Sequence, residues 1–114
     1  MRDRSVKIRA VYEEDERQYI DIFSCLTDGN YIDIEKAASG IARDWEESKN
    51  SYTLWRFILS FDDDGYAYME WESGHQAATI DILGKHMVAG ATFTRFDGLR
   101  EGSSRYLIDS IEDA

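Results

Sequence analysis

The run Asp62-Asp63-Asp64-Gly65 is the segment of this 114-residue chain that comes nearest to a cation-binding loop. Clustered carboxylates followed by glycine begin a calcium loop, because Ca²⁺ is bound by oxygen ligands. The spacing does not complete such a loop: with Gly65 at the sixth position, the bidentate acid expected at the twelfth would fall on Trp71. We therefore interpret the run as an exposed hairpin turn that carries three negative charges.

Two histidines, His75 and His86, and a single cysteine, Cys25, are the other candidates for metal binding or nucleophilic chemistry. No H-x-x-H or H-E-x-x-H spacing places two ligands on one element, so we predict no metal site and no cofactor. Cys25 lies in an apolar run, where a lone cysteine is usually a small core residue. Paired carboxylates could perform acid–base catalysis, but the abundance of acids makes any chosen pair uninformative. The sequence therefore favours a protein that is not an enzyme.

Acidic residues outnumber Lys and Arg by 23 to 13, which gives a formal net charge of −10. A field of this sign repels nucleic acids and anionic lipid head groups, and it accelerates association with basic surfaces. The charge therefore predicts a partner protein with a basic surface, such as a nuclease or another nucleic-acid-binding effector. It argues against direct contact with nucleic acid or with a membrane.

Hydrophobic alternation with a period of two predicts strands in several parts of the chain, which we expect to form one domain over residues 1–114. The clearest case is a hairpin, in which the apolar face of residues 53–61 returns, after the turn at Asp62–Gly65, as the apolar face of residues 67–71. Further strands are expected at residues 6–10, 78–82 and 87–96. Together, residues 53–96 are expected to form an antiparallel meander.

Helical spacing of apolar residues is clearest over Asp33–Glu47, where Ile34, Ala38, Ile41 and Trp45 fall on one face. Residues 17–26 fit either a helix, which we slightly favour, or a strand in a hairpin with residues 5–12. Residues 104–111 fit either a helix or an edge strand. We therefore predict an α+β fold, in which an antiparallel meander of about four to five strands packs with two to three helices.

The predicted recognition surface combines acids with exposed tyrosines, because aromatic residues anchor interfaces and acids steer basic partners. It comprises the turn residues Asp62, Asp63 and Asp64, the outer-face residues Tyr66, Tyr68, Glu70 and Glu72 of the returning strand, and Glu46 and Glu47 of the predicted helix.

The function that size and charge favour is a small protein inhibitor, which blocks the basic, nucleic-acid-binding surface of an enzyme. Phage anti-defence proteins, anti-CRISPR proteins among them, and toxin immunity proteins have this general size and charge, so the comparison is an analogy of composition. One alternative is a secretion-type chaperone that binds an extended client. A second alternative is a small-ligand-binding domain or an enzyme, which needs a pocket. We expect a cytoplasmic monomer or homodimer.

Overall fold

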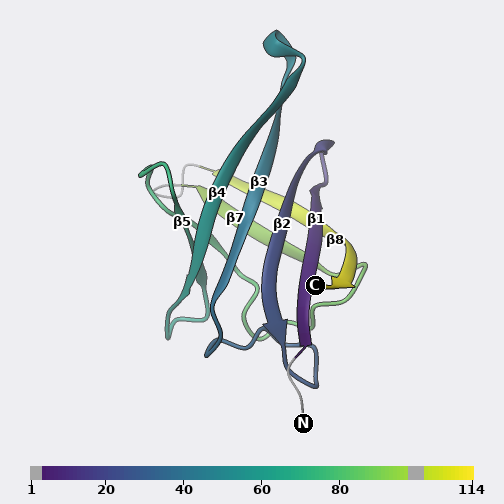
Figure 1. Cartoon of the computed structure of the whole chain (residues 1–114), viewed down its shortest axis with the longest axis vertical. Helices are drawn as coiled ribbons and strands as arrows, with labels where there is room; N and C mark the ends of the chain where they lie inside the picture. Colours follow the sequence, from purple (N-terminus) through teal and green to yellow (C-terminus); the bar gives the residue numbers. More distant parts are fainter. Residues whose placement is uncertain (1–3, 98–101) are drawn as a thin grey trace.

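In the computed structural model, which describes residues 4–97 and 102–114, the chain forms a closed barrel of eight antiparallel strands (Figure 1). Each strand pairs with the next one in sequence, and β8 pairs with β1 to close the ring. The strands are β1 (Arg4–Tyr12), β2 (Asp15–Leu26), β3 (Ala38–Glu46), β4 (Ser51–Phe61), β5 (Ala67–Trp71), β6 (Ala78–Ile80), β7 (Thr92–Asp97) and β8 (Gly102–Asp113). A 3-10 turn at Glu47–Lys49 is the one helical segment in these ranges.

The predicted α+β class is wrong, because none of the three segments considered as helices is helical. The hairpin of β4 and β5 is confirmed, with Phe57 opposite Trp71 and Leu59 opposite Met69. The first strand is confirmed as β1. The strand expected at 78–82 is shortened to β6, and the one expected at 87–96 is β7, which begins at Thr92.

The helix predicted over Asp33–Glu47 is instead a turn followed by β3. In β3 the residues that face inward are Ala38, Gly40 and Ala42, and Ile34, which the helical pattern needs, is 57% exposed. Small residues are needed on the inner face of β3 because the side chain of Phe57, on the neighbouring strand β4, occupies the space beside Gly40. A Cβ atom at Gly40 would collide with the ring of Phe57 and with the backbone carbonyl oxygen of Asp21.

The two ambiguous segments are both long strands. Residues 17–26 belong to β2, which forms with β1 the hairpin that had been the less favoured alternative. Residues 104–111 belong to β8, which lies between β7 and β1 and is therefore not an edge strand. Both strands carry buried residues at every second position in their central parts, as a barrel wall requires.

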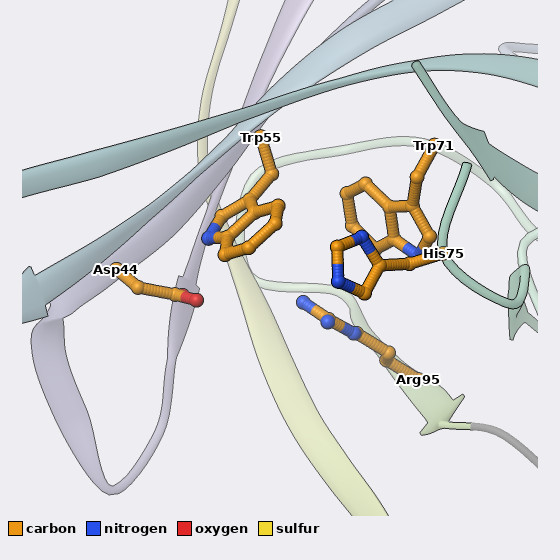
Figure 2. Close-up of a pocket in the computed structure, with 5 residues that line it drawn as sticks. All are labelled: Asp44, Trp55, Trp71, His75 and Arg95. Carbon is orange, nitrogen blue, oxygen red and sulfur yellow. The ribbon is translucent and has the colours of Figure 1, made fainter. Parts of the chain in front are cut away.

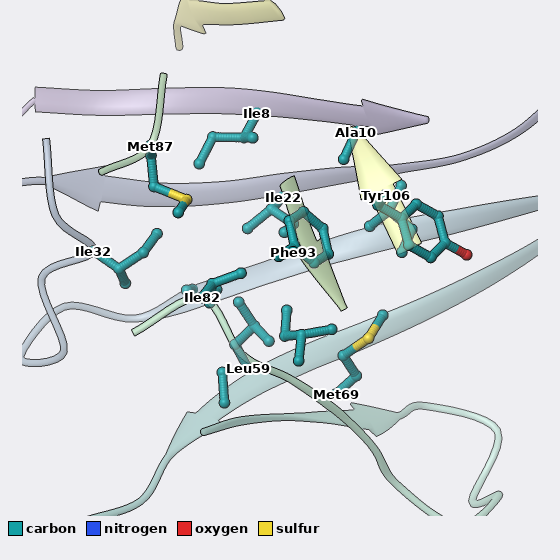
Figure 3. Close-up of a cluster of buried hydrophobic side chains, with 14 of the residues drawn as sticks. Ile8, Ala10, Ile22, Ile32, Leu59, Met69, Ile82, Met87, Phe93 and Tyr106 are labelled. Atoms are coloured by element: carbon teal, nitrogen blue, oxygen red, sulfur yellow. The ribbon is translucent and has the colours of Figure 1, made fainter. Parts of the chain in front are cut away.

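Much of the barrel interior is filled by apolar side chains (Figure 3). An eight-stranded barrel is just wide enough to be packed by its own residues or to hold one small ligand. Here the bulky residues Ile8, Ile22, Met69 and Phe93 meet at the centre, and each is at most 1% exposed. Inside this part the barrel is a packed core.

Two loops close the end of the barrel nearest the described start of β1. The β2–β3 loop meets the β6–β7 loop where the backbone N–H of Met87 donates to the carbonyl oxygen of Asn30 (2.8 Å). The rings of Tyr31 and His86 lie 4.4 Å apart, and the Tyr31 hydroxyl is 2.9 Å from Nε2 of His86. The side chain of Met87 is buried against the core. These contacts cover the barrel interior at this end.

Candidate functional site: a polar cavity at the open end of the barrel

The opposite end of the barrel contains a cavity of about 180 Å³, lined by Asp44, Trp55, Trp71, His75 and Arg95 (Figure 2). The strands β3, β4, β5 and β7 supply four of these residues, and His75 comes from the loop between β5 and β6. The register explains why they converge. Asp44, Trp55, Trp71 and Arg95 share the inward parity of the core residues Ala42, Phe57, Met69 and Phe93 and lie one step nearer the open end.

Aromatic rings form much of the cavity wall. Trp55 and Trp71 meet edge to face, with ring centroids 6.4 Å apart, and the His75 ring lies 5.4 Å from Trp55 at nearly a right angle. Phe57 supports Trp71 from the core side, with centroids 5.5 Å apart. These edge-to-face contacts fix the orientation of the indoles and leave flat apolar surface facing the cavity.

Arg95 is the positive group of the cavity, and its side chain is only 15% exposed. Its Nε donates to the carboxylate of Asp97 (2.9 Å), and Nη1 donates to the hydroxyl of Tyr106 (3.4 Å). The guanidinium also lies over the Trp71 ring, 5.2 Å from the centroid. Burial alone would lower the Arg95 pKa, but Tyr106 and Asp97 raise it overall, so this side chain stays charged.

Asp44 is the negative group that faces Arg95 from the other side of the cavity. Figure 2 shows the guanidinium directed toward the space between Asp44 and Trp55, and the indole nitrogen of Trp55 on the side of Asp44. The two charged groups form no ion pair in the described structure, and Nε1 of Trp55 is buried without a hydrogen-bond partner there. Burial raises the Asp44 pKa, and Arg95 offsets only part of that rise.

His75 lies at the mouth of the cavity on an exposed loop. Its Nδ1 is 2.7 Å from the Ser73 hydroxyl oxygen, which leaves Nε2 as the nitrogen without a hydrogen bond among the described residues. A serine nucleophile would need a histidine that is oriented by a third group. Within the described ranges no carboxylate contacts His75, so the pair is not arranged as a catalytic triad.

The arrangement is suited to binding. Charged side chains inside a barrel are costly unless something satisfies them, because burial strips them of water. Here a hydrogen-bond acceptor, a donor fork and apolar rings converge on a hollow that is open to solvent. Pockets for small molecules have this composition of mostly apolar walls and a few converging polar groups.

The three aspartates of the predicted surface lie at the β4–β5 turn, where all are exposed. They also build that turn. Asp62 Oδ1 accepts from the backbone N–H of Asp63 (2.6 Å), and Asp64 accepts from the backbone N–H of Tyr66 and the hydroxyl of Tyr68. The bond to Asp64 raises the pKa of Tyr68 to about 12. The interpretation of the run as a hairpin turn is confirmed.

Glu70 and Glu72 are exposed at the far end of the returning strand, away from this turn, where Glu70 lies opposite Ile58. Tyr66, at its start, is 38% exposed and packs edge to face against Phe96. Glu46 and Glu47 lie at the other end of β4, where Glu46 accepts from the Thr53 hydroxyl and Glu47 pairs with Arg17. Since β4 has 11 residues, Glu46 lies roughly 35 Å from the aspartates of the turn, at about 3.3 Å per residue. Glu70 and Glu72, whose backbone N–H donates to the carbonyl oxygen of Arg56, lie between these two ends. The nine residues therefore do not form one patch.

The remaining sequence candidates are scattered. His75 is at the open end and His86 at the closed end, so the two histidines do not meet. Cys25 is partly exposed, 3.6 Å from the Ser5 hydroxyl, and does not belong to the buried core. Among the described residues, no group of His, Cys, Asp and Glu is arranged to hold a metal ion.

Sequence reasoning missed the cavity, although two of its residues had been assigned correctly to the inner face of the β4–β5 hairpin. Trp55 and Trp71 were interpreted as core, because nothing local shows that the barrel is unfilled at their level. Asp44 lies in the Asp33–Glu47 segment, which was predicted as a helix. The one available signal was Arg95, a charge at an inward position between Phe93 and Asp97 in a predicted strand.

Comparison with known protein families, with curated proteins and with solved structures finds no match to this chain. Within the ranges that the structure describes, no helix is both long and apolar enough to span a membrane.

Proposed function

We propose that this chain is a binding protein that takes one small molecule into the open end of its barrel. The observation that carries the proposal is the 180 Å³ cavity in which Asp44 and Arg95 face each other without pairing. A side chain pair left apart in a partly buried hollow is a stability cost that a ligand bridging both groups would offset. Small-ligand binding was the least favoured hypothesis from the sequence.

The size of the cavity limits the ligand. A cavity of roughly 150 Å³ accommodates benzene, so 180 Å³ admits one ring or a compact molecule of similar volume. Larger molecules would bind with one such group inside and the rest outside the open end. Binding, without chemical conversion, is proposed because no nucleophile with an oriented base lines the cavity in the described structure.

Tryptophan indole signals in a ¹H–¹⁵N NMR spectrum would test this function. The chain has three tryptophans: Trp55 and Trp71 line the cavity, whereas Trp45 packs against Tyr52 and Arg17 outside it. A library of fragments of about ten non-hydrogen atoms should contain members that shift the Trp55 and Trp71 signals saturably and leave Trp45 in place. The proposal fails if no fragment does so, or if Trp71→Ala leaves the shifts of Trp55 unchanged.

A second candidate is the acidic inhibitor predicted from the sequence, with one specific observation in its favour. Asp62, Asp63, Asp64, Glu70 and Glu72 are exposed on one hairpin, and none of them forms an ion pair within the described residues. An uncompensated group of five acids would attract a basic partner. The partner's identity, the cytoplasmic location and the monomeric or dimeric state remain predictions.

Salt dependence of association would test this second candidate. The two-residue change Glu70→Gln and Glu72→Gln, which leaves the turn intact, should slow association with a basic nuclease by several fold at low salt, since steering depends on charge. Glu47→Gln, in the 3-10 turn that precedes β4, is the matched control and should have little effect. Equal effects of the two changes would show that the β4–β5 hairpin is not the contact surface.

A further inference from the structure

The chemistry of the cavity narrows the class of ligand, an inference that rests on the proposed function. Arg95 already shares its charge with Asp97 at 2.9 Å, so it offers donor groups without an excess of positive charge. Asp44 and Asp97 place two carboxylates around the one guanidinium of Arg95, on a chain whose net charge is −10. An anionic ligand is therefore disfavoured by the local field and by the whole-molecule field alike.

The hydrogen-bonding groups define the edge of the ligand. Nε of Arg95 is engaged by Asp97 and Nη1 by Tyr106, while Nη2 donates to no described residue. Figure 2 shows the guanidinium group of Arg95 directed toward Asp44 and Trp55. A carboxylate accepts hydrogen bonds and a guanidinium donates them. A molecule that bridges the two groups must present a donor to Asp44 and an acceptor to Arg95.

The walls define the body of the ligand. The faces of Trp55 and Trp71 and the ring of His75 favour a flat π system over a branched aliphatic one, because planar rings stack on such surfaces. An amino acid zwitterion would match the two charges but would leave the aromatic surface poorly covered.

We propose that the cavity binds a neutral heteroaromatic ring of nucleobase size, whose edge carries a hydrogen-bond donor beside an acceptor. Adenine, guanine and cytosine have such an edge, and their sugar or phosphate substituents would project through the open end. The ring lies against the indoles, its donor contacts Asp44, and its acceptor contacts Arg95.

The test is a titration of the intact protein with adenosine, guanosine and cytidine, followed by the indole signals of Trp55 and Trp71. Proline, benzoate and benzylamine serve as zwitterionic, anionic and cationic probes of comparable or smaller size. At least one nucleoside should bind saturably and at least about tenfold more tightly than the three other probes. Binding of one of these probes in preference to every nucleoside would overturn the ligand class and leave the proposed function standing. If no nucleoside binds while fragments still shift the Trp55 and Trp71 signals, the ligand class is likewise overturned and the proposed function stands.

Matched variants separate recognition from folding. Asp44→Asn should weaken binding of the preferred nucleoside by roughly tenfold, since hydrogen bonds to charged groups are stronger than those to neutral groups. Arg95→Gln should weaken it similarly. The exposed residues Asp109 and Arg105, on the outside of β8, provide the controls Asp109→Asn and Arg105→Gln. An unchanged Trp45 indole signal shows that each variant is folded. Equal weakening by the control variants would contradict the assignment.

Discussion

At the scale of single residues, the molecule contains two buried or partly buried carboxylates whose pKa values shift in opposite directions. Asp44 faces Arg95 without an ion pair and its pKa is raised. Asp21, on the outer face of β2, is 2% exposed and accepts from both Arg9 (2.8 and 2.9 Å) and Arg43 (2.6 Å). Burial alone would raise the Asp21 pKa, but the hydrogen bonds and charges of the two arginines lower it overall. The two arginines thus outweigh burial at Asp21, whereas at Asp44 burial outweighs the charge of Arg95.

Asp44→Asn should stabilise the protein at about pH 7 and lose that advantage in acid. The folded pKa of Asp44 lies above its ordinary value of 3.8, so wild-type stability falls as the pH rises through the folded pKa. The variant has no such titration, and its difference from wild type should shrink toward and below pH 3.8. Melting temperatures of the variant and the wild type, measured from about pH 7 to below pH 3.8, would give this difference in stability. A difference that does not change with pH would contradict the burial argument.

Asp21→Asn should destabilise the fold by about 2 kcal/mol, since it removes an ionised acceptor from two arginines that stay partly buried. The contribution of Asp21 to stability changes with pH in the opposite direction to that of Asp44. A lowered folded pKa contributes stability above the ordinary value of 3.8, which is lost as the pH falls through the folded pKa. Urea unfolding of both proteins at several pH values checks this. A loss in the variant that persists unchanged in strong acid would point to packing instead of charge.

At the scale of elements, the sequence identifies strands reliably where large apolar residues alternate. The β4–β5 hairpin has Phe57, Leu59 and Met69 on one face, and no helix accommodates that pattern. Strand β3 could not be recognised in this way. Its inward residues are Ala38, Gly40 and Ala42, and the apolar Ile41 and Trp45 on its outer side complete a helical spacing by coincidence. The space for Phe57 that makes Gly40 necessary is a tertiary contact, which no local pattern contains.

The candidate site was less predictable than the strands for a related reason. Inward parity alone does not distinguish a side chain that fills the core from one that borders a hollow. Trp55 and Phe57 have the same parity on β4, and only the neighbouring strands decide that Phe57 is 2% exposed while Trp55 faces a cavity. Asp44 on β3 and Arg95 on β7 are 51 positions apart in the chain, and only the closed barrel brings them to the same cavity.

Gly65→Ala at the β4–β5 turn should cost about 1 kcal/mol. Gly65 has a φ of +90°, a backbone region that L side chains rarely adopt, although no atom lies within 4 Å of the position a Cβ would take. Gly102, at the start of β8, has equally open space and no positive φ, so Gly102→Ala is the matched control and should be close to neutral. Chemical denaturation of the two variants compares them. Equal losses would show that backbone conformation is not the cause.

At the scale of the whole molecule, the charge of −10 acts on stability as well as on binding. Exposed ion pairs contribute little, and repulsion among like charges opposes the compact state. Raising NaCl from about 10 mM to about 150 mM shortens the Debye length from roughly 30 to 8 Å. The melting temperature at neutral pH should therefore rise, and the rise should shrink near the isoelectric pH of about 4.5. A melting temperature that falls with added salt at neutral pH would show that attraction within ion pairs outweighs repulsion among like charges.

Closure of the ring by β1 and β8 also decides how another chain can associate with this one. Every strand of the described barrel has hydrogen-bonded neighbours on both sides, so the sheet ends in no free edge. Strand addition, by which an extended peptide joins a sheet, requires such an edge. A client or target must therefore bind through side chains on the outer face, at the hairpin tips or over the mouth of the cavity. The same closure protects the chain from edge-to-edge aggregation, and β6, with three residues and two paired positions to β7, is where the ring would open first.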